Sequence, residues 1–247
     1  MIRVEVTRSR GSTPREAGAT MFVSAEITQG TIGGGQLEYM AIDRARQMLA
    51  RDETTARMDI PLGPEIGQCC GGRVELTLTR VESLPAAPAL PQVLIFGAGH
   101  VGRALARALA LLPLRPILID QRADELAQAG GETRLTPLPE NEIRTAPRGS
   151  SYIILTHDHA LDFLLAAEAL RRLDAPYTGM IGSRTKLAQF RRFAHAQGLD
   201  TGRLICPIGA GGSSDKRPEV IAAFTAAELI ARLTQSTSAM KEYPCDS

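Results

Sequence analysis

The chain has 247 residues, of which 44% are hydrophobic and 22% charged, so it can form one large or two smaller globular domains. Its 28 basic and 27 acidic residues leave a net charge of +1, which argues against a nucleic-acid partner. No apolar run approaches the roughly 18 residues of a membrane span, and no secretory leader precedes the cysteines. We therefore expect a cytoplasmic, reduced protein with no membrane partner and with thiols that are functional or buried.

The first 82 residues predict a small α+β domain. Alternating apolar and polar side chains indicate strands at 2–8, 19–24 and 73–81. A helix should begin near Gln36, because apolar residues share one face at helical spacing: Leu37, Met40, Ala41, Ala45, Met48 and Leu49. The segment 28–35 contains too much glycine for a regular element.

A proline-rich segment at 83–92 is typical of a linker, since it carries three prolines in ten residues and almost no charge. It predicts a first domain at 1–82 and a second at 93–247. The change in pattern after the linker supports this division.

The second domain begins with a βαβ unit. An apolar strand at 93–96 ends in the turn 97-GAGHVG-102, a helix runs to about Leu112, and a second strand follows at 116–120. Further strands and helices alternate after it: strands at 152–156 and 177–181, helices at 160–173, 183–197 and 218–233, the last with Pro218 in its first turn. This order predicts a Rossmann-like, doubly wound parallel sheet.

The glycines of that turn have the spacing of a dinucleotide-binding fingerprint. Gly97, Gly99 and Gly102 let a backbone approach a pyrophosphate at the helix N-terminus, and Asp120, at the end of the next strand, would accept hydrogen bonds from a ribose. His100, inside the turn, would meet a phosphate or a neighbouring strand. The alternative is a Rossmann fold that no longer binds a dinucleotide.

A polar cluster, 156-THDHALD-162, follows a predicted strand at the edge where doubly wound sheets bind ligands. His157, Asp158, His159 and Asp162 have the chemistry of metal ligands, although their spacing does not match a known hydrolase motif. The alternatives are a polar loop that lines a ligand crevice, with His157 in contact with the ligand, or a helix cap at Asp158.

Two later segments also suit an anion. In 179-GMIGSRTK-186, Ser183 can cap a helix, while Arg184 and Lys186 place cations at its start, which the helix dipole disfavours unless an anion binds there. A solvated basic face is the alternative. The loop 205–219 is flexible or cradles an anion, and its Cys206 suits a small buried residue.

Three glycine-rich segments of the first domain indicate a binding surface rather than simple connections. They are 11-GSTPREAGATM-21, with Ser12, Thr13 and Arg15 in a tight turn; 30-GTIGGGQLE-38; and 66-IGQCCGGRVE-75. The last contains Cys69 and Cys70, which cannot readily bridge to each other as neighbours.

Taken in order, these motifs, with VLIFGAGHVG, MIGSRTK and DKRPEVIAA, resemble those of the xanthine dehydrogenase accessory protein family (XdhC/CoxI), over nearly the whole chain. The tail 215-DKRPEVIAA-223 is more similar to the xanthine dehydrogenase branch. Two departures are the start of the chain almost at its first strand, where relatives carry a short helical leader, and the extra glycine in 209-GAGGSS-214.

The resemblance implies a chaperone rather than an enzyme. Such proteins bind the molybdenum cofactor, a molybdopterin, protect it, support its sulfuration with a cysteine desulfurase, and insert it into the molybdenum subunit of xanthine dehydrogenase, an enzyme of purine metabolism. It also makes a homodimer plausible. The residues expected at the cofactor are Cys69, Cys70, Gly97, Gly99, His100, Gly102, Asp120, His157, Arg184 and Lys186, with Cys69 and Cys70 as contacts to molybdenum.

Two other classes of function stay open. An NAD(P)-dependent oxidoreductase would explain the glycine turn and Asp120 but would leave Cys69 and Cys70 without a role. A scaffolding protein with a vestigial nucleotide site would need neither cofactor.

Overall fold

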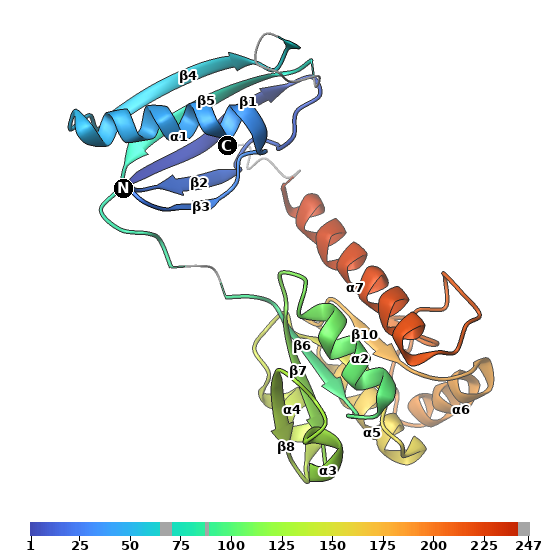
Figure 1. The fold of residues 1–247 in the computed structure, drawn as a ribbon. Helices are drawn as coiled ribbons and strands as arrows, with labels where there is room; N and C mark the ends of the chain where they lie inside the picture. Colours follow the sequence, from blue (N-terminus) through green and yellow to red (C-terminus); the bar gives the residue numbers. More distant parts are fainter. Residues whose placement is uncertain (65–70, 87–88, 242–247) are drawn as a thin grey trace. The chain divides into compact units, whose positions relative to one another are not determined.

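The structure, a computed structural model, describes residues 1–64, 71–86 and 89–241, with side chains described as far as residue 234. The chain divides into two compact units, Met1–Pro88 and Ala89–Ser247, and each has its own sheet (Figure 1). Within the described residues, no helix combines the length and the apolar character needed to cross a bilayer.

The first unit is an antiparallel sheet of five strands, in the order β3-β2-β1-β5-β4, with one helix, α1. Its elements are β1 (Ile2–Arg10), β2 (Thr20–Val23), β3 (Thr28–Gly30), α1 (Gly35–Ala50), β4 (Thr55–Pro61) and β5 (Arg73–Arg80). The helix lies along the sheet (Figure 1), and the α+β class predicted for this domain is confirmed.

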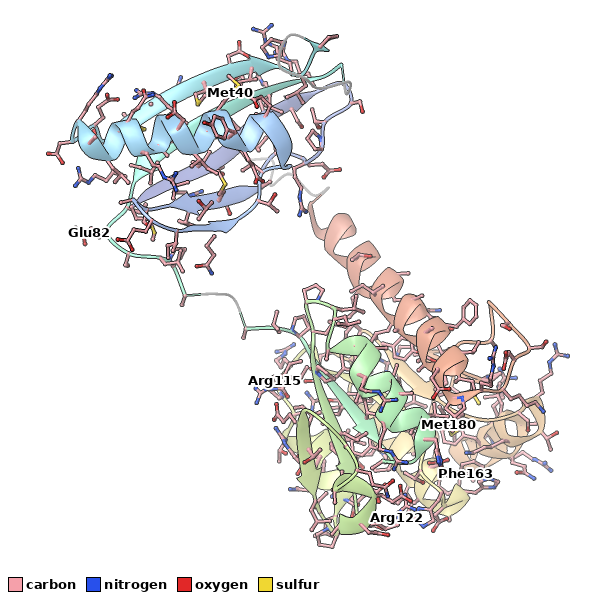
Figure 2. All side chains as sticks on the ribbon, viewed as in Figure 1. Met40, Glu82, Arg115, Arg122, Phe163 and Met180 are labelled. Atoms are coloured by element: carbon pink, nitrogen blue, oxygen red, sulfur yellow. The ribbon has the colours of Figure 1, made fainter. Side chains whose placement is uncertain are left out.

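Alternation in the strands and helical spacing in α1 together make the core of this unit. Ile2, Val4 and Val6 of β1 are fully buried, because every second residue of the strand faces the helix. On α1 the predicted apolar face is confirmed: Leu37, Ala41, Ala45 and Met48 are buried, and Met40 and Leu49 pack against them. The side chain of Met40, labelled in Figure 2, lies on α1.

Two elements of this unit differ from the sequence-based expectation. The segment 28–35, expected to be irregular throughout, contains β3, and α1 already begins at Gly35. Strand β3 forms because its residues pair with β2, Met21 opposite Gly30, and not because of an apolar pattern of its own. Strand β4 was not predicted, since only Ile60 of its seven residues is buried.

The second unit is a six-stranded parallel sheet in the order β11-β10-β9-β6-β7-β8. Its strands are β6 (Gln92–Phe96), β7 (Arg115–Asp120), β8 (Glu132–Leu135), β9 (Ser151–Ile154), β10 (Thr178–Met180) and β11 (Leu204–Ile205). Its helices are α2 (His100–Leu109), α3 (Ala123–Leu126), α4 (Pro139–Thr145), α5 (His159–Arg171), α6 (Arg184–His195) and α7 (Pro218–Lys241).

This order is that of a doubly wound sheet, so the predicted Rossmann-like fold is confirmed. From β6 the chain builds β7 and β8 on one side, and then returns to build β9, β10 and β11 on the other. The carboxyl ends of β6 and β9 therefore flank the switch point at which such sheets bind ligands.

Two apolar layers cover this sheet. One joins α2 and α7 to the sheet and includes Leu105, Leu109 and Leu229; the other lies under α5 and α6. In the second layer Phe163 of α5 (Figure 2) meets the ring of Phe190 of α6 edge to face, with ring centroids 5.4 Å apart.

Short elements of this unit escaped prediction: α3, β8, α4 and β11 have two to seven residues and few buried side chains. The longer elements were found, with shifted ends. Pro218 is the first residue of α7, as predicted, because its missing N–H is one that a helix start leaves without a partner.

The triglycine turn of the first unit binds a carboxylate of its own chain. Oε1 of Glu38 accepts hydrogen bonds from the backbone N–H groups of Ile32 (2.9 Å), Gly33 (3.2 Å) and Gly34 (2.9 Å), and from the Thr31 hydroxyl. Burial by itself raises the pKa of Glu38, but these hydrogen bonds outweigh it and hold the pKa below its usual value.

We predict that Glu38→Ala lowers the free energy of unfolding at pH 7 by roughly 1–3 kcal/mol, because it leaves several N–H groups without an acceptor. A lowered pKa adds stability above the unfolded-state value of about 4.3, and this contribution is lost as the pH falls through the folded-state pKa. The difference between variant and wild type, measured by urea unfolding, should therefore shrink below pH 4.

Two controls accompany this measurement. Glu38→Gln keeps a neutral oxygen acceptor and should lose less stability. Asp43→Ala removes an exposed carboxylate from the same helix and should change stability by less than about 0.5 kcal/mol. Equal stability of Glu38→Ala and wild type at pH 7 would contradict the role of Glu38.

Candidate functional site

The turn between β6 and α2 is built from the three fingerprint glycines, each with a different role. Gly97 has φ +118°, and a Cβ there would lie 2.4 Å from the carbonyl oxygen of Leu155. A Cβ on Gly102 would lie 1.9 Å from the carbonyl oxygen of Gly97, so the start of α2 must pack directly on the turn. Beside Gly99, the N-cap of α2, there is open space.

The open space at Gly99 lies at the N-terminus of α2, and no side chain caps this helix. The first N–H groups of a helix carry a partial positive charge and lack partners inside the helix. The position therefore suits a phosphate or another anion. His100, the first residue of α2, is exposed beside it.

Asp120, at the end of β7, has a carboxylate that is already fully hydrogen-bonded. Oδ2 accepts from the Ala98 N–H (2.6 Å) and from Nη2 of Arg122 (2.9 Å); Oδ1 accepts from the backbone N–H (2.9 Å) and Nε (3.0 Å) of Arg122. Burial raises the pKa of Asp120, but these donors outweigh it and lower the pKa overall. The expected ribose acceptor thus has protein partners in this structure.

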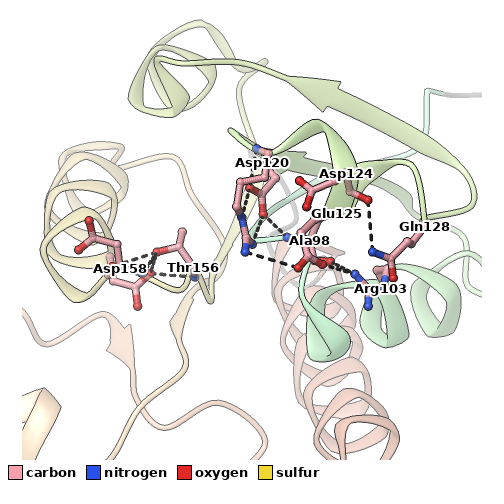
Figure 3. A network of polar contacts seen from close by, with 10 residues as sticks. Ala98, Arg103, Asp120, Asp124, Glu125, Gln128, Thr156 and Asp158 are labelled. Carbon is pink, nitrogen blue, oxygen red and sulfur yellow. Dashed lines mark hydrogen bonds and ion pairs between the residues drawn. The ribbon is translucent and has the colours of Figure 1, made fainter.

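A second arginine, Arg103, extends this network (Figure 3). It is buried on α2, and its Nη1 donates to the Ala98 carbonyl oxygen at 2.6 Å and to the Glu125 carboxylate. Glu125 also lies 3.5 Å from Nη1 of Arg122. Sequence reasoning missed Arg103 and Arg122; the available signal was an arginine directly after Gly102 and another two residues after Asp120.

A small pocket opens at the switch point. Its lining brings together predicted site residues from three segments, Gly97, Asp120 and His157, with Thr156 between the strand β9 and the helix α5. In this form the pocket holds about one water molecule. A larger ligand would not fit inside it.

The polar segment after β9 caps a helix. Asp158 is the N-cap of α5, and its Oδ1 accepts hydrogen bonds from the N–H groups of Ala160 (2.8 Å) and Leu161 (3.4 Å). The helix cap was one of the three alternatives predicted for this segment. His157 and His159 are exposed. Among the described residues no group of three or more His, Cys, Asp or Glu side chains could hold a metal ion.

Asp162 forms a buried ion pair with Lys186. Asp162 is 0% exposed and Lys186 is 7% exposed, and the ammonium donates to Oδ2 of the carboxylate. Oδ1 accepts from the Thr156 N–H (2.9 Å) and hydroxyl (2.7 Å). The positive charge of Lys186 is therefore balanced inside the protein. The pair joins α6 to α5, and the Thr156 hydrogen bonds join α5 to the segment after β9.

The rest of the α6 start is closer to the prediction. Ser183 caps α6 by accepting from the Lys186 N–H at 3.2 Å, as expected. Arg184 is exposed, and within the described residues its side chain forms no ion pair. Of the two cations expected here, only Arg184 presents its charge to solvent.

Cys206 packs half-buried against the core, near the aliphatic part of Lys186. A Cβ on Gly182 would lie 3.2 Å from Sγ of Cys206 and 2.9 Å from Cδ of Lys186. Burial raises the pKa of the Cys206 thiol, although the nearby Lys186 ammonium opposes the shift. A small packing residue, as predicted, describes it better than a reactive thiol.

The glycine-rich segments of the first unit meet at one end of its sheet. A Cβ on Gly33 would lie 2.6 Å from Cγ of Pro14, and a Cβ on Gly72 would lie 2.2 Å from the carbonyl oxygen of Ser12. The segments 11–21 and 30–38 and the glycines that follow Cys70 are therefore neighbours. Cys69 and Cys70 themselves lie outside the described residues.

Comparison with known proteins identifies the family. Residues 93–229 match the XdhC Rossmann domain, and residues 1–60 match the XdhC and CoxI family. The chain belongs to the XdhC and CoxI family. The resemblance found in the sequence motifs is thus confirmed.

This XdhC/CoxI-family chain is similar to a curated protein in sequence and to a solved structure in fold. It is 29% identical over 242 residues to the uncharacterized protein YqeB of Escherichia coli (strain K12), and it covers 42% of that protein's length. A crystal structure described as a xanthine dehydrogenase from Bacillus halodurans has a TM-score of 0.77 and 16% identity, over 95% of this chain and 91% of the other. That likeness shows a shared fold.

We predict that Gly102→Ala destabilises this XdhC/CoxI-family protein by more than about 2 kcal/mol, because its methyl group would overlap the Gly97 carbonyl. In an unconstrained helix the same change would stabilise by roughly 0.5–1 kcal/mol. Gly99→Ala, at a position with φ −66° and open space, is the matched control and should leave the melting temperature unchanged. A stable Gly102→Ala variant would contradict the close packing.

We predict that Lys186→Met lowers the free energy of unfolding by about 3–5 kcal/mol, because it leaves a carboxylate buried without its cation. The double variant Lys186→Met/Asp162→Asn should recover part of the loss, since no buried charge then remains. Arg184→Met, at an exposed position of the same helix turn, is the control and should be neutral. Denaturant unfolding of all four proteins tests this, and a neutral Lys186→Met would contradict it.

Proposed function

We propose that this protein is an accessory protein that prepares the molybdenum cofactor for an enzyme of the xanthine dehydrogenase type. It binds the molybdopterin cofactor, protects it, supports its sulfuration and delivers it to the enzyme. The observation that carries the proposal is the family match to both units of the fold, residues 1–60 and 93–229, in one chain.

The chemistry of the described residues fits an anionic cofactor. The cofactor carries a phosphate, and the uncapped N-terminus of α2 beside Gly99 would hold it, with Gly97 and Gly102 shaping the turn. His100 and Arg184 are exposed and would add charge-assisted hydrogen bonds. Lys186 would contact the cofactor only if its ion pair with Asp162 broke, so we propose that it stabilises the start of α6 rather than binding the cofactor directly.

The dithiolene-bound molybdenum is a soft, sulfur-rich centre, for which cysteine thiolates are suitable ligands. Cys69 and Cys70 would contact it or relay sulfur during sulfuration. Gly72, two residues after Cys70, packs against the backbone of Ser12. The C-terminal part of the segment 66–75 therefore lies next to the turn 11–21. His157, which lines the small pocket, is also a proposed cofactor residue.

The proposed partners follow from the same role. The molybdenum subunit of a xanthine dehydrogenase would receive the cofactor, a cysteine desulfurase would supply sulfur, and the protein itself would act as a homodimer in the cytoplasm. These partners belong to the maturation of an enzyme of purine metabolism.

An NAD(P)-dependent oxidoreductase is the second candidate, and the strand order with its glycine turn favours it. One measurement separates the candidates. Protein purified from a host that makes the molybdenum cofactor is denatured and oxidised, and the released compound is identified. A fluorescent pterin is expected; a nicotinamide dinucleotide would support the oxidoreductase, and neither compound would overturn both.

We predict that Cys69→Ala/Cys70→Ala reduces the amount of copurified pterin and the activation of a cofactor-free target dehydrogenase by at least tenfold. Cys206→Ala is the matched thiol control, because Cys206 is half-buried and its burial raises its pKa, which favours the unreactive thiol form. The Cys206→Ala variant should retain the copurified pterin and should still activate the target dehydrogenase. Full pterin retention and activation in the double variant would remove both cysteines from the proposal.

A further inference from the structure

The carboxylate of Asp120 is saturated, and Arg122 supplies most of the donors. A carboxylate offers about four lone-pair positions, and in this structure each oxygen accepts two hydrogen bonds: one from Ala98, one from the Arg122 backbone and two from the Arg122 guanidinium. The ribose of a dinucleotide needs this carboxylate to accept from its hydroxyl groups. Only the two guanidinium hydrogen bonds can be released without moving the backbone.

The guanidinium of Arg122 is also held from its other side. Its Nη1 lies 3.5 Å from Oε1 of Glu125, whose second oxygen accepts from Arg103, and Arg103 in turn donates to the Ala98 carbonyl at 2.6 Å. The network closes on the glycine turn itself (Figure 3). Arg122, labelled in Figure 2, is thus held between Asp120 and Glu125, and its side chain is 32% exposed.

We propose that Arg122 is a specificity-determining residue that closes the Rossmann site to ligands with a free ribose diol, such as NADH. The fold keeps the glycine turn and the helix N-terminus, which suit a phosphate, and withholds the acceptor that a ribose needs. The site therefore favours phosphate-bearing ligands that do not need to donate a hydrogen bond to Asp120. This selectivity leaves the proposed molybdenum-cofactor role unchanged, and it counts against an NADH-dependent oxidoreductase.

The test measures NADH binding to the full chain at pH 8 by isothermal titration calorimetry. Wild type should bind NADH at best in the millimolar range, and Arg122→Ala should bind it at least tenfold more tightly, because Asp120 regains two free lone pairs. The double variant Asp120→Ala/Arg122→Ala should lose this gain. Thermal unfolding of each variant confirms that it is folded.

A matched control removes an arginine with the same bidentate pairing elsewhere. Arg144 binds Glu168 through Nε (2.9 Å) and Nη2 (3.1 Å), at the end of α4 just before β9 begins, and Arg144→Ala should leave NADH binding unchanged. Tight NADH binding by wild type would overturn the proposal. So would no gain in Arg122→Ala, or a gain that survives in the double variant.

Discussion

The second unit depends on the way the ends of β6 and β7 are tied together. The N–H of Gly97 donates to the Ile119 carbonyl at 2.8 Å, and the next N–H, of Ala98, donates to the Asp120 carboxylate. Gly97 can hold this turn because of its positive φ, and Gly102 lets α2 start directly on top of it. The position of the helix N-terminus, and hence of any bound anion, follows from these contacts.

Two buried carboxylates flank the switch point, and the protein neutralises both. Asp120 is paired with Arg122 on the β7 side, and Asp162 is paired with Lys186 on the β9 side. A buried charge without a partner would cost several kcal/mol, so Lys186 stabilises the fold by balancing the fully buried Asp162. Asp120 also accepts from the backbone N–H groups of Ala98 and Arg122, so it keeps two donors without the Arg122 guanidinium. What this edge of the sheet still presents is the backbone of α2 and the exposed side chains around it.

The sequence predicted what depends on local pattern. The glycine spacing at 97–102 identified the Rossmann turn, and the cap residues Asp158 and Ser183 were found because a cap lies next to the helix it begins. The partners of Asp120 and Lys186 were missed for a different reason. The side chain of Arg122 can adopt many rotamers, and only some of them reach Asp120, two residues earlier. Asp162 and Lys186 are 24 residues apart, so only the packed fold brings them together.

Two glycine turns of the chain, at residues 32–34 and 97–99, show why glycine alone does not identify a binding site. At residues 32–34 the backbone N–H groups donate to Glu38, a carboxylate of the same chain, so this turn already holds an anion. At Gly99 no side chain caps α2, and the space beside it is open. An external anion therefore has a reason to bind the second turn and none to bind the first, which is why the proposed cofactor site is centred on α2.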